Sequence, residues 1–199
     1  MPVVTVSGHS RKVGKTSIIE GLIAALPEYR WTALKVSSHL HSDNSEYPAK
    51  SCAVIEETDR DGGNDTSRFL KAGARRAFWI QAERMETAAS VARAIVKEAP
   101  YVLIEGNSVL DFIAADFSIL VMNRSVAEFK KSAHGILSRI DALVLIRNNA
   151  ERPEWENLLE SVPKNIPRFE TDDPGAFPPA LTELLRSRLS PRIPTKRRT

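Results

Sequence analysis

One segment near the start of the chain combines residue types and a spacing that point to phosphate chemistry. It lies between an apolar run and a helical pattern and reads Gly8-His9-Ser10-Arg11-Lys12-Val13-Gly14-Lys15-Thr16-Ser17. Backbone N–H groups in a glycine-containing turn before a helix form a concave site for phosphate oxygens. In such a loop Lys15 reaches the β- and γ-phosphates of a nucleotide, and the Thr16 hydroxyl binds Mg²⁺. The alternative is an ordinary strand–helix turn that contains Gly-Lys-Thr by chance.

Glu105 is a second candidate for the same chemistry. It ends the apolar run Val102-Leu103-Ile104 and precedes Gly106. A carboxylate in this position can hold Mg²⁺ through water or orient an attacking water molecule. The alternative is a surface acid that closes a strand. The open backbone of Gly106-Asn107-Ser108 and the phosphate loop upstream favour the functional interpretation.

Lys35 lies at the carboxyl end of a second apolar run, and His39 and His41 follow it. A His-x-His pair can bind a metal, and Cys52 or Asp43 would be its further ligands. No other ligand lies at a diagnostic spacing in the sequence. Zinc binding, contact with an anionic ligand and simple exposure to solvent therefore stay open for the two histidines.

Asn148 and Asn149 follow the apolar run Ala142–Ile146. An asparagine amide both donates and accepts hydrogen bonds, so it can pair with the edge of a purine base. A turn explains an Asn-Asn pair equally well, and both interpretations stay open.

Apolar runs alternate with helical patterns along the chain, which predicts an α/β fold in three layers. We expect about six or seven mostly parallel strands with helices on both faces, because the strands are apolar throughout. The expected strands are 3–7, 31–36, 77–80, 101–104, 117–122, 142–146 and a short one at 168–170; the expected helices are 16–26, about 66–72, 87–99, 125–137, 153–161 and 178–189. Thr66 or Asp65 is the expected cap of the second helix. Residues 37–64 are polar and predict a long loop, and ligands bind at the carboxyl ends of the strands in such sheets.

The composition of the chain is that of a globular protein. It has 199 residues, of which 42% are hydrophobic and 27% charged, and one cysteine, so no internal disulfide can form. No apolar run has the length of a membrane span, and we expect a cytoplasmic protein. The net charge of +3 is misleading, because six basic residues and no acid lie in 186–199, which leaves −3 for residues 1–185. We expect one domain over 1–189 and a disordered basic tail over 190–199, with no role in binding nucleic acid.

The loop and its helix resemble the P-loop nucleotide-binding proteins, a group that includes dethiobiotin synthetase and the cobyrinate amidoligases. Among them, the molybdopterin-guanine dinucleotide biosynthesis protein B family fits best. Its pattern Asp-Ser-x-Arg-x-x-x-Ala-Gly-Ala is matched at identical spacing by Asp65-Thr66-Ser67-Arg68-Phe69-Leu70-Lys71-Ala72-Gly73-Ala74. Val102-Leu103-Ile104-Glu105-Gly106 is similar to that family's Val-Glu-Gly strand end. The resemblance covers residues 1 to about 107.

This resemblance implies a protein that binds GTP (or ATP) with Mg²⁺ and assists the attachment of a guanine nucleotide to molybdopterin, with slow or no hydrolysis of its own. It implies that Lys15 neutralises phosphate charge, that Thr16, Asp65 and Glu105 hold the metal or a water molecule, and that Arg68 meets an anionic group. Molybdopterin and a guanylyltransferase are the implied partners, and such proteins are often homodimers. The chain departs from the family in its longer, basic loop and in the turn Lys35-Val36-Ser37-Ser38-His39-Leu40-His41.

Two other functions compete with this one. Five residues separate Gly8 from the Gly14-Lys15 pair, as in dethiobiotin synthetase, whose loop also ends Val-Gly-Lys-Thr. This resemblance to dethiobiotin synthetase implies an ATP-dependent ligase that activates a carboxylate, with Lys35 facing the substrate. The third alternative is a phosphate-binding protein whose basic tail attaches it to nucleic acid.

Overall fold

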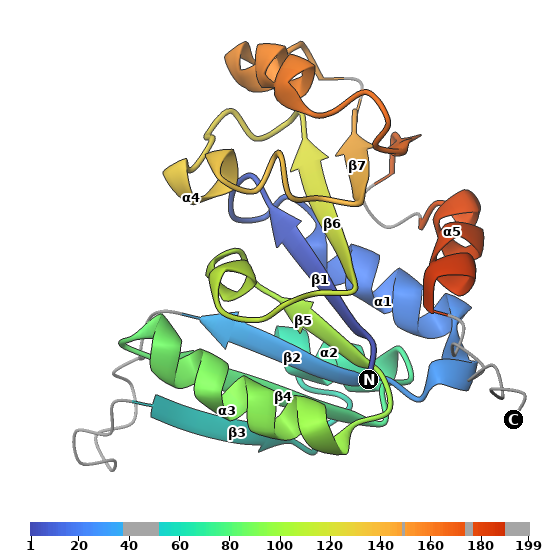
Figure 1. Cartoon of the computed structure of the whole chain (residues 1–199). Helices are drawn as coiled ribbons and strands as arrows, with labels where there is room; N and C mark the ends of the chain where they lie inside the picture. Colours follow the sequence, from blue (N-terminus) through green and yellow to red (C-terminus); the bar gives the residue numbers. More distant parts are fainter. Residues whose placement is uncertain (38–51, 149, 174–176, 190–199) are drawn as a thin grey trace, which may run out of the picture.

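The computed structural model describes residues 1–37, 52–148, 150–173 and 177–189, which form an α/β fold in three layers (Figure 1). The central sheet has eight strands in the described residues, in the order β3-β4-β2-β5-β1-β6-β7-β8. The strands are β1 (Val3–Gly8), β2 (Thr32–Ser37), β3 (Cys52–Glu57), β4 (Arg76–Ala82), β5 (Val102–Glu105), β6 (Phe117–Asn123), β7 (Ala142–Ile146) and β8 (Arg168–Thr171). All neighbouring pairs are parallel except β3 and β4, so the predicted fold class is confirmed.

Helices cover both faces of this sheet. The α-helices are α1 (Lys15–Ala25), α2 (Asp65–Lys71), α3 (Met85–Glu98), α4 (Lys131–His134) and α5 (Pro179–Leu189), and the 3₁₀ helices are η1 (Pro27–Tyr29), η2 (Ser108–Asp111) and η3 (Glu154–Ser161). Residues of α1, α2 and α5 pack together on one face, and α3 packs on the other, in front of the sheet in Figure 1. A third apolar cluster joins β6 and β7 to η3.

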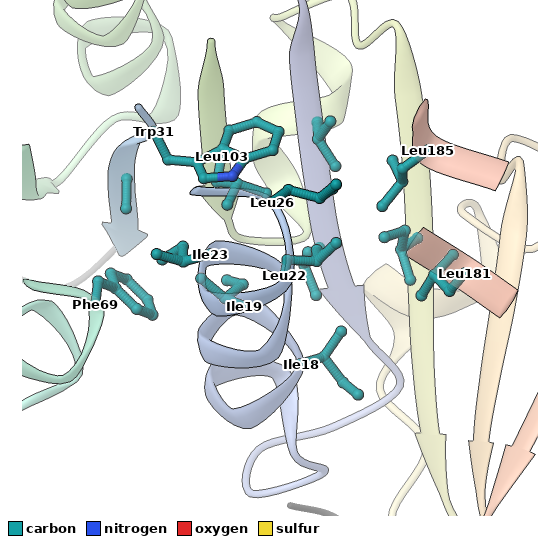
Figure 2. Packing of buried hydrophobic residues seen from close by; sticks show 14 of the residues in the cluster. Ile18, Ile19, Leu22, Ile23, Leu26, Trp31, Phe69, Leu103, Leu181 and Leu185 are labelled. Atoms are coloured by element: carbon teal, nitrogen blue, oxygen red, sulfur yellow. The ribbon is translucent and has the colours of Figure 1, made fainter. Parts of the chain in front are cut away.

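Helix α1 is the central helix of its face, and it also follows the loop 8–14, the predicted phosphate loop. Its apolar residues recur at helical spacing, and Ile18, Ile19, Leu22 and Ile23 are all buried. Figure 2 shows them between Phe69 of α2 on one side and the leucines of α5 on the other. This packing fixes the start of α1 against the sheet, and Pro27 follows where the helix has ended.

The edge strand β3 corrects the prediction of one long loop over residues 37–64 and raises the strand count to eight. It pairs antiparallel with β4, with Val54 beside Ile80. Val54 and Ile55 are each 46% exposed, and two acids follow them. The strand is formed by main-chain pairing at the sheet edge rather than by burial, so its sequence lacks the pattern of a buried strand.

Two predicted helices also differ from the structure. The expected helix 125–137 contains only the short α4, because the residues before it bond to other parts of the chain: the Lys130 N–H donates to the His9 carbonyl at 2.9 Å. The expected helix 153–161 is the 3₁₀ helix η3. Helix α2 is capped by Asn64, whose side-chain oxygen accepts from the Ser67 N–H, and not by Asp65 or Thr66.

No helix in the described part of the chain is long and apolar enough to cross a membrane. His39, His41, Asp43, Asn149 and the tail 190–199 lie outside the described residues.

Candidate functional site

An open cavity of about 570 Å³ lies where the loop after β1 meets the carboxyl ends of β2 and β5. It is lined by Arg11, Lys12, Val13, Gly14, Lys15, Thr16, Ser17, Lys35, Asp65, Arg68, Glu105 and Asn123. Five of these side chains are basic and two are acidic, so the cavity favours an anion. The first turn of α1 adds to this preference, because it holds no acidic residue and its free N–H groups carry the positive end of the helix dipole.

The backbone of the loop is held in a bent conformation by two residues with positive φ. Lys12 has φ 57° and Gly14 has φ 100°, and α1 begins immediately after Gly14. At Gly8 the loop passes so close to its own residues that an added Cβ would lie 2.6 Å from the Val13 side chain. Gly14 is therefore needed for its φ and Gly8 for close packing.

Asn107 fastens the start of this loop to the end of β5. Its side-chain oxygen accepts from the Gly8 N–H at 2.9 Å, and its amide nitrogen donates to the Gly8 carbonyl at 2.7 Å. These two bonds replace the main-chain hydrogen bonds that Gly8 would make if the pairing of β1 with β5 continued past Glu105. Our sequence analysis did not assign Asn107 to the site, although its place two residues after Glu105 was a signal.

The Lys15 ammonium is placed over the loop, and its Nζ donates to the Ser10 carbonyl at 3.1 Å. Burial lowers the pKa of Lys15, and the nearby Glu105 carboxylate opposes that effect. An anion bound in the loop would add a negative charge beside this ammonium and stabilise its charged form.

Three oxygen-bearing side chains converge at the start of α1. The Thr16 hydroxyl lies 3.1 Å from Asp65 Oδ1 and 3.3 Å from Glu105 Oε2. Asp65 is the first residue of α2, and Glu105 is the last residue of β5. The parallel pairing of β2 and β5 places Lys35 directly beside Glu105, and the Lys35 ammonium also pairs with Asp65.

The two carboxyl groups have opposite pKa shifts. For Asp65, burial alone raises the pKa, but the hydrogen bond and charge of Lys35, together with the Thr16 hydrogen bond and the charge of Arg68, outweigh it and leave the pKa lowered. For Glu105, burial raises the pKa, and the charge of Lys15 only partly opposes it. A divalent cation beside both groups would favour the ionised form of Glu105.

These oxygens fit Mg²⁺ better than a transition metal. Mg²⁺ is held in proteins by one or two carboxylates together with substrate phosphates and water. The described residues contain no group of three or more His, Cys, Asp or Glu side chains that would form a closed metal centre. The zinc alternative depended on His39 and His41, which lie outside those residues, and on Cys52, which is the first residue of β3.

Arg68 lines the cavity but is already paired. Its guanidinium donates to both carboxylate oxygens of Glu20, at 2.9 and 2.6 Å, and to the Ser17 hydroxyl at 3.3 Å. It lies 3.9 Å from Asp65. This two-bond ion pair between Glu20 of α1 and Arg68 of α2 holds the two helices together. A ligand anion would have to share Arg68 with Glu20.

Other predicted site residues do not line the cavity. The His9 side chain is fully buried, and the Ser10 hydroxyl bonds to the Glu128 carboxylate. Asn148, with φ 50°, donates to Asn123 Oδ1 at 3.3 Å and to the Ser125 hydroxyl at 3.2 Å. Asn123, at the end of β6, does line the cavity, although our sequence analysis did not single it out.

No protein-family model matches the chain, and no curated protein matches it. Among solved structures, the chain is similar to HypB from Helicobacter pylori in complex with nickel, with a TM-score of 0.59 and 14% identity over 94% of this chain and 86% of HypB. It is also similar to LpxK from Aquifex aeolicus in complex with ATP, with a TM-score of 0.51 and 17% identity over 85% of this chain. The match spans 53% of LpxK, about half of its length. Both proteins have the P-loop NTPase fold.

The fold is that of the P-loop NTPases. The cavity lies beside the loop between β1 and α1 and at the carboxyl ends of the neighbouring strands, and Lys15, Thr16 and Glu105 are among the predicted residues that line it.

Proposed function

We propose that this chain binds a purine nucleoside triphosphate together with Mg²⁺ in the cavity over the loop 8–16. One observation carries the proposal: the Thr16 hydroxyl, at the start of α1, lies within hydrogen-bond distance of both Asp65 and Glu105. A hydroxyl and two carboxylates directly beside a loop that places Lys15 at the cavity are the groups that a metal–triphosphate requires.

In this proposal each residue has one task. Backbone N–H groups of the loop and the Lys15 ammonium bind the phosphates. Thr16, Asp65 and Glu105 hold Mg²⁺, which supplies positive charge to the phosphate oxygens. Lys35, now paired with Asp65, stands at the same end of the sheet and neutralises further negative charge.

The finer function rests on the resemblance of residues 65–74 and 102–106 to the molybdopterin-guanine dinucleotide biosynthesis protein B family. We infer from it a preference for GTP and an accessory role in making molybdopterin guanine dinucleotide, with slow or no hydrolysis. The position of Asp65 and Arg68 beside the loop supports the use of this segment at the site. Molybdopterin, a guanylyltransferase and a second copy of the chain are the partners in this proposal.

Calorimetry with GTP and with ATP, each with Mg²⁺, tests the proposal on the wild type and on Lys15→Ala. Loss of one charge-assisted contact costs about 2–3 kcal/mol, or roughly 30- to 150-fold in affinity. Lys97→Ala, an exposed change on α3, is the control and should leave the affinity unchanged. Absence of binding to either nucleotide, or equal binding by Lys15→Ala, would refute the proposal.

A ligase that consumes ATP is the second candidate function. It is favoured by Lys35, which lines the cavity beside the metal-binding carboxylates and could meet a substrate carboxylate there. Preference for ATP, with ADP released only when a carboxylate substrate is added, would select this function. Preference for GTP with little turnover would select the accessory role.

A further inference from the structure

His9 lies inside the phosphate loop, yet its side chain points away from the cavity into the protein. The His9 side chain is 0% exposed, whereas Arg11 and Lys12 of the same loop are exposed. A buried polar ring must have its nitrogens hydrogen-bonded, and both nitrogens of His9 are.

The two hydrogen bonds select one form of the ring. Nε2 lies 3.2 Å from the Asn123 backbone nitrogen, which can only donate, so Nε2 carries no proton. Nδ1 lies 3.0 Å from the Glu128 carbonyl oxygen, which can only accept, so Nδ1 carries the proton. The geometry therefore assigns His9 as neutral imidazole in its Nδ1–H form.

The same ring is packed between aromatic side chains. The Trp155 ring lies 4.6 Å from the His9 ring and the Phe129 ring 5.5 Å from it, measured between centroids. Trp155 is itself held by a hydrogen bond from its Nε1 to the Val126 carbonyl at 2.8 Å. The ring of His9 thus has little freedom to turn.

The backbone of His9 joins the same region of the chain. Its N–H donates to the Val121 carbonyl at 3.2 Å, and its carbonyl accepts from the Lys130 N–H at 2.9 Å. Four hydrogen bonds from one loop residue thus reach β6 and the segment that follows it. The connection continues to the cavity, because Asn123 lines it and the Asn123 Oδ1 accepts from Asn148.

We propose that His9 is a positioning residue that holds the phosphate loop at a set distance from Asn123, at the end of β6, and that it does so only as the neutral Nδ1–H imidazole. The proposal deepens the proposed function, since it gives the nucleotide site a link between the phosphate end and the wall formed by β6. His9 touches no ligand in this role.

Protonation of Nε2 would break the link, because two N–H donors would then face each other at Asn123. The charged groups that act on the ring are Lys15 from the loop and Glu128 from the segment after β6, while the uncharged Trp155 of η3 packs against it. Burial lowers the pKa of His9, and the charge of Lys15 acts in the same direction against the opposing effect of Glu128. The neutral form is thereby kept at neutral pH.

The first test needs no ligand. In ¹⁵N NMR of the free full-length protein, His9 is expected to show one protonated nitrogen at Nδ1 and one bare nitrogen at Nε2. The Asn123 amide is expected to exchange slowly with solvent in the wild type and at least about tenfold faster in His9→Phe, which keeps the ring packing and removes both side-chain bonds. A proton on Nε2, or unchanged exchange at Asn123, would overturn the proposal.

The second test measures affinity for GTP with Mg²⁺ between pH 5 and 8. We expect the wild type to lose affinity as the pH falls through the lowered pKa of His9, and His9→Phe to bind roughly tenfold more weakly at pH 7.5 with that pH dependence removed. His9→Asn, which keeps a donor near the Nδ1 position, is expected to recover part of the affinity, and His134→Asn is the control that retains the wild-type profile. Equal affinity and equal pH profiles for wild type and His9→Phe would overturn the positioning role. If the wild type binds no nucleotide, the proposed function fails, and the first test alone decides the link between His9 and Asn123.

Discussion

Replacing Asn107 with alanine tests whether the phosphate loop is held from outside or holds its own shape. In the structure the Asn107 side chain makes two hydrogen bonds to Gly8, at 2.9 and 2.7 Å, where β1 ends and the loop begins. Asn107→Ala leaves both backbone groups of Gly8 without these partners. Each hydrogen bond contributes about 0.5–1.5 kcal/mol net, so the two together contribute about 1–3 kcal/mol.

This free energy is expected to appear in nucleotide affinity. Without the two hydrogen bonds from Asn107 to Gly8, the loop samples other conformations in the free protein, and nucleotide binding must order it again. About 1–3 kcal/mol corresponds to roughly a 5- to 150-fold weaker affinity for GTP with Mg²⁺. Asn107→Asp keeps the acceptor for the Gly8 N–H but places a carboxylate oxygen against the Gly8 carbonyl, so we expect it to bind no better than Asn107→Ala.

Calorimetry on the folded variants measures the effect, and urea unfolding shows how much of the loss is global stability. Ser132→Ala is the matched control, because it removes only the 3.5 Å contact of Asn107 and leaves both bonds to Gly8 in place. A nucleotide affinity of Asn107→Ala within about twofold of the wild type, with an unchanged urea midpoint, would refute the reasoning. It would show that the loop keeps its conformation without the hydrogen bonds from Asn107.

Three further predictions concern stability. Leu22→Ala empties a fully buried position on α1 and is expected to cost about 2–5 kcal/mol in urea unfolding, and a loss below about 1 kcal/mol would contradict the packing in Figure 2. Burial raises the pKa of Glu105 above its ordinary 4.5, so the folded chain binds the Glu105 carboxyl proton more tightly than the unfolded chain does. The contribution of protonated Glu105 to stability is therefore lost as the pH rises from 4.5 through the raised pKa. Glu105→Gln is therefore expected to unfold at higher urea than the wild type at pH 8 in the absence of Mg²⁺; equal midpoints would contradict this. For the partly exposed fork between Arg68 and Glu20, a double-mutant cycle with Arg68→Met and Glu20→Gln is expected to give a coupling of about 0.5–1 kcal/mol, and a coupling of zero would show that the pair does not join α1 to α2.

The strands of the sheet centre could be predicted because they are buried on both faces. Continuous apolar runs such as Ala142–Ile146 are typical of parallel strands covered on both faces, and β7 has the predicted bounds. The edge strand β3 could not be predicted in this way. Its Val54 and Ile55 are half exposed, and its formation depends on main-chain bonds to β4 that no local pattern encodes.

The convergence at the site follows from the same logic. Because parallel strands end at one edge of the sheet, Lys35 and Glu105 were expected to lie near the phosphate loop, and the register of β2 and β5 places them side by side. The residue pattern could not show that Arg68 is paired with Glu20, or that the chain after β6 is bonded to the loop instead of forming a helix from residue 125.

The sequence by itself determined the fold class and the position of the candidate site, because hydrophobic periodicity and a glycine-containing loop before a helix are local properties of the chain. The tertiary structure decided what each side chain in that loop does. His9 and Lys15 are both polar residues of one short segment, but His9 is turned into the protein by partners more than a hundred residues away, and Lys15 is left facing the cavity. Hydrogen bonds to distant backbone groups have no signature in the local sequence, so only the folded chain separates a side chain that faces the cavity from one that is bonded into the protein.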